Sequence, residues 1–219
     1  DVRRLVKNGA VAVNGRVVTD FSLKTEYGAN ITVNGTPLDT SEHLYIMLNK
    51  PQGVVSASED GKDTTVVDIL PDEFKRKNLF PAGRLDKDTV GFCLITDDGD
   101  FTFRLTRPEF GFEKRYFFMA FGELSKADIE KVESGGIPFG DGSFSRPAEF
   151  SGLVLSTVLE NSEYIPENIR EHALKNPSGK ITSGIIAVSE GKHHEVKLLL
   201  HSCGCKIFRL KRLSVGDIF

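Results

Sequence analysis

The sequence predicts an α+β protein: a mixed, largely antiparallel sheet flanked by helices, preceded by a small α/β unit. Short segments rich in aromatic and β-branched residues recur from residue 44 onward and predict strands. A few helix start and stop signals lie between them, including one capping-box pattern. Two Asn-Gly dipeptides near the amino terminus predict tight hairpins in the small unit.

The amino-terminal unit is predicted to span residues 1–39. Residues 2–7 resemble the end of a helix that stops at Asn8-Gly9, because glycine is favoured just past a helix terminus. Strands on either side of the two Asn-Gly turns are predicted at 10–13, 16–18 and 30–33. Such a unit is too small to build much core, and it begins within a helix, so we expect upstream sequence in the full gene.

Residues 40–43 are predicted to be a linker, and the second domain is predicted to span 44–219. Its strands are predicted at 44–48, 90–95, 116–121, parts of 148–159, 185–188 and 207–213. Its helices are predicted from Thr64 or Thr65 to Leu70, from Ser125 to Gly135, and from His194 to Cys203. The polar, proline-containing segment 160–182 is predicted to be an irregular excursion.

The composition predicts a cytoplasmic globular protein. With 219 residues, 39% of them hydrophobic, the chain is long enough for one sizeable core and a small accessory domain. No apolar run reaches the roughly 18 to 20 residues of a membrane span, and the amino terminus lacks signal-peptide features, so we expect no membrane partner. Cys93 lies far from Cys203 and Cys205, which favours reduced thiols over a disulfide framework.

Charge is distributed unevenly along the chain, although the formal net charge is only −3. Residues 2–16 contain four basic residues and no acidic one, and residues 192–212 contain six basic residues and Glu195 alone as an acid. Two such basic regions are typical of a nucleic-acid-binding protein. They are equally compatible with two ordinary solvated surfaces.

The segment 83–89 is the first candidate for chemistry. It contains Asp86 and is followed by an apolar run to Ile95, which predicts a loop that leads into a buried strand. A carboxylate at the mouth of such a strand is held by a rigid scaffold and still reaches solvent, which suits a nucleophile or a general base. On these residues alone, Asp86 also fits an ordinary turn residue.

Longer motifs resemble one known family. The string AGRLDKDTVGFCLITDDG at 82–99, preceded by MLNKPQG at 47–53, closely resembles the signature of the bacterial ribosomal small-subunit pseudouridine synthases. Three later segments agree in order and character: EKRYFFMAFG at 113–122, SEGKHHEVKLLL at 189–200 and FRLKRLSVGDI at 208–218. The weakest stretch is 145–182. Residues 2–37 resemble the S-four-type RNA-binding domain without its first helix.

This resemblance implies the pseudouridine synthase fold for 44–219 and isomerisation of a ribosomal RNA uridine, in 16S rRNA, on a flipped-out base. It makes Asp86 the nucleophile, and Lys197 its cationic partner at a position where related families often have arginine. It makes Tyr116 the residue that stacks on the uracil and assists proton removal from C5. Attack on the ribose carbon and addition to the uracil ring both remain open.

The resemblance also implies substrate contacts. Arg84 is expected to reach phosphates or to fill the gap left by the flipped base, and Leu210 to pack on the base. The residues expected to contact the RNA backbone are Arg3, Arg4, Lys7, Arg16, Lys50, Lys192, Lys211 and Arg212. The expected partner is ribosomal RNA or a ribosomal assembly intermediate, bound by a monomer.

Neither a metal nor a cofactor is expected. His193, His194, His201, Cys203 and Cys205 are close in sequence, but their spacing matches no common zinc arrangement. The chain contains no glycine-rich phosphate-binding fingerprint, and the isomerisation is redox-neutral.

Two alternative functions remain. The first is modification of large-subunit 23S rRNA, since the related large-subunit enzymes share this organisation, although MLNKPQG and the TDDG ending favour the small-subunit branch. The second is a non-catalytic rRNA-binding assembly factor, against which the presence of Asp86, Tyr116 and Lys197 argues. Glu195 stands where glutamine is more usual, and it either weakens the pairing of Asp86 with Lys197 or faces solvent.

Overall fold

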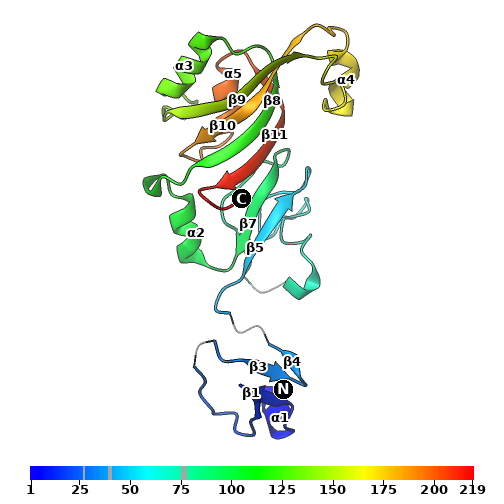
Figure 1. Cartoon of the computed structure of the whole chain (residues 1–219), viewed down its shortest axis with the longest axis vertical. Helices are drawn as coiled ribbons and strands as arrows, with labels where there is room; N and C mark the ends of the chain where they lie inside the picture. Colours follow the sequence, from blue (N-terminus) through cyan, green and yellow to red (C-terminus); the bar gives the residue numbers. More distant parts are fainter. Residues whose placement is uncertain (27, 39–40, 75–77) are drawn as a thin grey trace. The chain divides into compact units, whose positions relative to one another are not determined.

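The computed structural model describes residues 1–219 except 27, 39–40 and 75–77. It divides the chain into two compact units, Asp1–Leu44 and Tyr45–Phe219. Both units are drawn in Figure 1. The linker predicted at 40–43 lies beside this division, although its first residue, Thr40, is outside the described residues.

The first unit contains one short helix and a four-stranded sheet. Helix α1 (Val2–Lys7) is capped by the Asp1 side chain, which accepts a hydrogen bond from the Arg3 N–H. The strand order is β2 (Arg16–Val17), β1 (Val11–Val13), β3 (Ile31–Val33), β4 (Thr36–Pro37). Asn14 and Asn34 adopt left-handed backbone conformations, each followed by a left-handed glycine, which confirms the two predicted hairpin turns.

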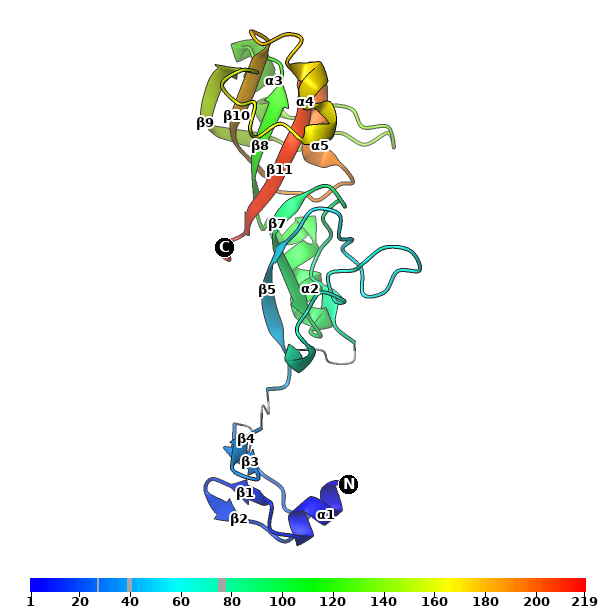
Figure 2. The same cartoon turned by 90° about the vertical axis from the view of Figure 1, so that its right-hand side faces the viewer.

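The second unit is built on one seven-stranded sheet with the order β5-β7-β11-β8-β10-β9, while β6 pairs with β7 (Figures 1 and 2). Its strands are β5 (Tyr45–Lys50), β6 (Phe80–Pro81), β7 (Val90–Thr96), β8 (Lys114–Phe121), β9 (Ala148–Thr157), β10 (Lys180–Val188) and β11 (Lys206–Val215). Strands β7 and β11 pair in parallel and the other pairs are antiparallel. The predicted mixed, largely antiparallel sheet is therefore confirmed.

Helices cover both faces of this sheet. They are α2 (Gly99–Thr106), α3 (Lys126–Ser134), α4 (Glu167–Ala173) and α5 (Glu195–His201), with 3₁₀ turns at Asp72–Phe74 and Pro108–Phe110. Helices α3 and α5 pack on one face, where Val132 and Leu199 join Phe118 in the main core. Phe121 lies three residues after Phe118 on β8, so its side chain points to the opposite face of the sheet. Helix α4 packs on that face, against Phe121 and Ile181.

One predicted helix is absent. The segment from Thr65 to Leu70 forms a turn, although Thr65 and Asp68 exchange the side-chain-to-backbone hydrogen bonds of a capping box, at 2.8 and 3.1 Å. Pro71 follows at once, and proline disfavours the helical conformation of the residue before it. The capping signal is thus genuine, but the helix has no room to continue.

The segment predicted to be irregular contains regular structure. Helix α4 lies inside 160–182, and strand β10 begins at Lys180 rather than at Ile185. Burial accounts for the difference: Ile165 and Ile181 are fully buried together, and Ile169 of the helix packs against them. Helix α2 was also not predicted, although Asp98 caps it by accepting a hydrogen bond from the Phe101 N–H at 2.8 Å.

Within the described part of the chain, every helix is too short or too polar to cross a membrane.

Gly91 offers a test of the parallel junction between β7 and β11. It adopts φ +100°, pairs with Arg212, and a Cβ there would collide with the Arg212 carbonyl oxygen. We therefore expect Gly91→Ala to lower the free energy of unfolding by at least about 2 kcal/mol in urea titrations. The matched variant Gly99→Ala, whose Cβ meets no atom within 4 Å, should stay within about 0.5 kcal/mol of the wild type. Equal effects of the two changes would contradict this account of the junction.

Candidate active site

A pocket of about 120 Å³ lies in the second unit between the loop before β7, the start of α5, and strands β8 and β11. The five residues predicted to be catalytic or to bind substrate all line it: Arg84, Asp86, Tyr116, Lys197 and Leu210. A wider hollow of about 700 Å³ shares Arg84 and Asp86 with this pocket and continues past Val55 and His193. Asp86 thus stands where a small pocket meets a larger open surface.

A buried lysine, Lys50, holds the loop that carries Asp86 through hydrogen bonds to the loop's carbonyl oxygens. Lys50 has no exposed surface, and its Nζ donates to the carbonyl oxygens of Thr89 at 2.8 Å and Lys87 at 3.3 Å. From the other side, Ser56 Oγ accepts a hydrogen bond from the Leu85 N–H at 3.0 Å. The expected contact of Lys50 with the RNA backbone is therefore wrong, because this ammonium lies inside the protein and holds the loop.

The Asp86 carboxylate is contacted on both oxygens. Lys197 Nζ donates to Oδ2 at 2.7 Å, and His194 Nε2 lies 3.3 Å from Oδ1. The Asp86 side chain keeps 23% of its surface exposed. Burial opposes the charge on Lys197, but hydrogen bonds to Asp86 and Asp88 outweigh it and raise the lysine pKa. Lys197 therefore stays cationic and can stabilise an ionised, accessible Asp86.

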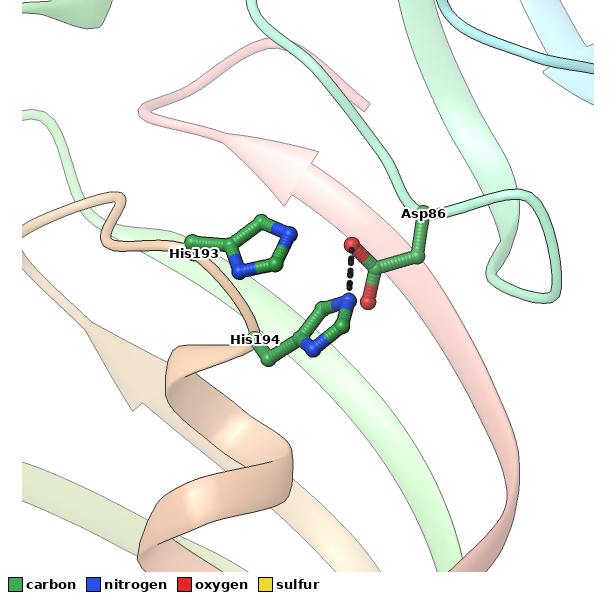
Figure 3. Close-up of side chains that lie close together, drawn as sticks. All are labelled: Asp86, His193 and His194. Carbon is green, nitrogen blue, oxygen red and sulfur yellow. Dashed lines mark ion pairs between the residues drawn. The ribbon is translucent and has the colours of Figure 1, made fainter. Parts of the chain in front are cut away.

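Two histidines face this carboxylate (Figure 3). The rings of His193 and His194 stack with centroids 3.8 Å apart, and His194 adopts a left-handed φ of +56° just before α5. One ligand atom each of Asp86, His193 and His194 lie within 4.8 Å of one another, a set of nitrogen and oxygen donors that could hold a metal ion. The Lys197 ammonium already bound to Asp86 opposes a second cation there.

The sequence also placed three other histidine and cysteine residues near this region, and they do not belong to the group of Asp86, His193 and His194. Among the described residues, His201, Cys203 and Cys205 belong to no such set of potential ligands. Cys205 is buried, and burial raises the pKa of its thiol to about 11.

Tyr116 and Leu210 come from neighbouring strands and form walls of the pocket. Tyr116 on β8 pairs with Arg212 on β11, and Leu210 pairs with Phe118, so these side chains share one face of the sheet. Burial raises the pKa of Tyr116, and the Arg212 guanidinium partly opposes this shift. The phenol therefore remains protonated at neutral pH and offers a ring face with one hydroxyl.

Arg212 does not lie where the sequence suggested. It was expected on the RNA-facing surface, but only 4% of it is exposed, and its Nε donates to the Phe92 carbonyl oxygen at 2.8 Å. Because β11 alternates, its neighbour Lys211 is exposed while Arg212 points to the covered face. The RNA-backbone expectation for Arg212 is therefore wrong, and the residue lines the pocket.

Two further pocket residues were not among the predicted site residues. Lys114 on β8 is 6% exposed and lies two residues before Tyr116, so both point to the same face of the strand. Glu195 begins α5 and is buried, so it does not face solvent as one alternative held. The strand was predicted at 116–121 and begins at Lys114, so the prediction left this lysine outside the strand.

Glu195 lies close to a second buried carboxylate, Glu190. Burial, followed by the charge of the nearby Glu190 and a hydrogen bond with it, raises the pKa of Glu195 to about 7. Lys192 donates its backbone N–H to Glu195 at 3.3 Å, while its Nζ lies 3.4 Å from Glu190 and donates to the Phe144 carbonyl oxygen at 2.6 Å. The Lys192 ammonium is thus already engaged within the protein.

The other candidates for contacts with the RNA backbone are exposed. They are Lys211 and, in the first unit, Arg3, Arg4, Lys7 and Arg16. Arg84 is also exposed, at a position where it lines both the small pocket and the wider hollow.

Comparisons with known proteins agree on one family. The family model described as RNA pseudouridylate synthase matches residues 44–202. An uncharacterized RNA pseudouridine synthase of Bacillus subtilis is 36% identical over 100% of this chain and 82% of its own length. The ribosomal large subunit pseudouridine synthase B of Bacillus subtilis is 32% identical over 95% of this chain and 76% of its own length. The ribosomal small subunit pseudouridine synthase A of Yersinia pestis is 31% identical over 99% of this chain and 81% of its own length.

A solved structure of a protein named for the same activity is also similar to this chain. The crystal structure of a pseudouridylate synthase is similar with a TM-score of 0.60 and 26% identity, over 99% of this chain and 82% of that one.

The Glu195 carboxyl predicts a pH-dependent stability. Its folded pKa of about 7 lies above the ordinary value of 4.5, so the stability it contributes is present below pH 4.5 and is lost as the pH rises through 7. We expect Glu195→Gln to gain thermal stability relative to the wild type between pH 5 and pH 8, as measured by unfolding curves at both values. The exposed Glu149→Gln serves as control. A Glu195→Gln difference that does not change with pH would contradict the assignment.

Proposed function

This chain belongs to the RNA pseudouridylate synthase family, whose members isomerise uridine in RNA, and from this premise we propose that it modifies one uridine of 16S ribosomal RNA with Asp86 as nucleophile. The observation that supports the nucleophile best is the pairing of a partly exposed Asp86 with Lys197 at 2.7 Å in the mouth of the pocket. An ionised carboxylate in that position is held in place by a cation yet remains open to a substrate.

The reaction breaks the bond between uracil N1 and ribose C1′ and joins C1′ to C5. The proton at C5 is lost and N1 gains one, so atoms and electrons balance without a redox partner or cofactor. Asp86 would form a transient covalent bond either to C1′ or to the uracil ring. Both routes need the same starting geometry, in which the uridine is turned out of its RNA helix and enters the pocket.

The pocket walls suit such a base. The Tyr116 ring offers a stacking surface, and its protonated hydroxyl lies among polar groups that can relay the C5 proton. Leu210, which also lines the pocket, would pack against the other side of the base. Arg84, exposed beside Asp86, would reach the phosphates or fill the gap in the RNA helix, which offsets part of the few kcal/mol that base flipping costs.

The choice of 16S rRNA rests on the motifs MLNKPQG at 47–53 and TDDG at 96–99, which resemble the small-subunit enzymes. The runner-up is 23S rRNA, since relatives named for either subunit are 31% and 32% identical to this chain. A non-catalytic assembly factor fits less well, because such a protein has no need for Asp86, Tyr116 and Lys197 in one pocket.

The first unit would supply affinity as an S-four-type RNA-binding domain. Its basic residues Arg3, Arg4, Lys7 and Arg16 are exposed, and basic side chains on a small rigid unit bind phosphates without reading sequence. We further propose that the protein acts as a cytoplasmic monomer on ribosomal RNA or on an assembly intermediate.

Asp86→Asn should fold normally and lose all turnover, because a neutral amide oxygen can still accept a hydrogen bond from Lys197 but is not a nucleophile toward carbon. Turnover is followed by release of tritium from transcripts labelled at uridine C5, since the C5 hydrogen is displaced in the product. Both 16S and 23S transcripts are tested, free and in partly assembled particles.

Asp141→Asn, in an exposed turn, is the matched control and should keep the wild-type rate. Appreciable tritium release by folded Asp86→Asn would overturn the nucleophile assignment.

Replacing Arg3, Arg4, Lys7 and Arg16 by glutamine, or deleting residues 1–39, should weaken RNA binding and lower its salt dependence. Four lost phosphate contacts reduce the slope of log affinity against log salt by about three. Filter binding between 50 and 300 mM salt measures this slope. An unchanged slope would count against a docking role for the first unit.

A further inference from the structure

Two cationic side chains in the pocket have buried nitrogens without a hydrogen-bond partner. They are Lys114 Nζ and Arg212 Nη2, and both residues line the pocket beside Asp86. Leaving such a donor buried and unpaired costs free energy, more for a charged group than for a neutral one. A ligand that brings acceptor atoms into this pocket would remove that cost.

The strand register brings these two cations together. Lys114 and Tyr116 lie two residues apart on β8, and Tyr116 pairs with Arg212 on β11, so all three side chains share the covered face of the sheet. Burial lowers the pKa of Lys114, the Glu195 charge opposes this shift, and Arg212 adds to it. Repulsion between the two cations thus adds to the cost of burying them.

The chemistry of the missing partner follows from these groups. Ammonium and guanidinium nitrogens only donate hydrogen bonds, so the ligand must present acceptors. The pocket has room for several non-hydrogen atoms, since a single water needs roughly 10–15 Å³ of such space. A uracil ring is a compact group that carries two carbonyl oxygens and fits both requirements.

We propose that Lys114 and Arg212 bind the carbonyl oxygens of the flipped uracil and thereby select uridine over cytidine. Cytosine carries an amino group in place of the carbonyl at C4, and that amino group would face a donor instead of satisfying it. This inference rests on the proposed function, because it takes the pocket to receive the target base.

The same contacts would assist the reaction. Departure of uracil from C1′ leaves a negative charge spread onto its carbonyl oxygens, and attack on the ring places a negative charge there as well. Cationic donors already in position stabilise such a charge at little reorganisation cost. Loss of one donor of this kind typically lowers turnover by about 100- to 1,000-fold.

Lys114→Met is the decisive variant, because it keeps most of the length of the unbranched side chain and removes the charge and the donors. We expect tritium release to fall by about 100-fold or more. RNA affinity in filter binding should fall far less than turnover, because phosphate contacts supply most of it. The melting temperature should be equal or higher, since an unpaired buried charge has been removed. Lys126→Met, at an exposed position on α3, is the matched control and should behave as wild type.

A purely structural lysine would give a different pattern, in which stability and rate fall together. That pattern, or a folded Lys114→Met that turns over at the wild-type rate, would overturn this inference while leaving the proposed function intact. Wild-type protein that releases no tritium from either RNA, free or assembled, would overturn the proposed function and this inference with it.

Transcripts in which the uridine oxygens at C2 or C4 are replaced by sulfur give a second readout. Sulfur accepts hydrogen bonds weakly, so one of these replacements should slow the wild type much more than it slows Lys114→Met. Equal slowing of both proteins would contradict a contact between Lys114 and a carbonyl oxygen.

Discussion

The ion pair between Asp86 and Lys197 is the constraint on which the pocket depends. It joins a loop before β7 to helix α5, 111 residues later in the chain, at 2.7 Å. Strands β7 and β11 pair in parallel, and Gly91 on β7 allows a close approach to Arg212 on β11. The buried ammonium of Lys50, at the end of β5, donates a hydrogen bond to the Thr89 carbonyl oxygen and so fixes the loop to β5. Together these features hold an accessible carboxylate next to a cation.

The sheet face beneath α5 combines packing with chemistry. Along β8, Phe118 and Ala120 belong to the main core, while Lys114 and Tyr116 on the same face line the pocket. Along this one strand, the same face of the sheet therefore contributes to the apolar core at one end and to the polar pocket at the other. Buried groups that are not satisfied within the protein gather at this boundary, as expected where binding or catalysis is retained at a cost in stability.

The sequence allowed much of this to be predicted, and the failures have physical causes. The hairpins at Asn14 and Asn34, the capped helix after Ser125 and the strand dominance follow from local signals. Helix α4 could not be predicted, because its stability comes from packing against distant Ile181. The residues Asp86, Tyr116 and Lys197 were identified through motif resemblance, and the sequence could not reveal which lysines and arginines are buried. Lys50 and Arg212 look like surface cations in the chain but lie inside the fold.

The most direct test of the account is to map pseudouridine in ribosomal RNA by chemical labelling and primer extension after incubation with the wild-type protein. The account predicts one new stop at a single position of 16S rRNA, in the free transcript or in a partly assembled particle. A stop in 23S rRNA instead would contradict the choice of subunit. No stop in either RNA, from protein that binds both, would contradict the central claim and leave a binding protein with an unused pocket.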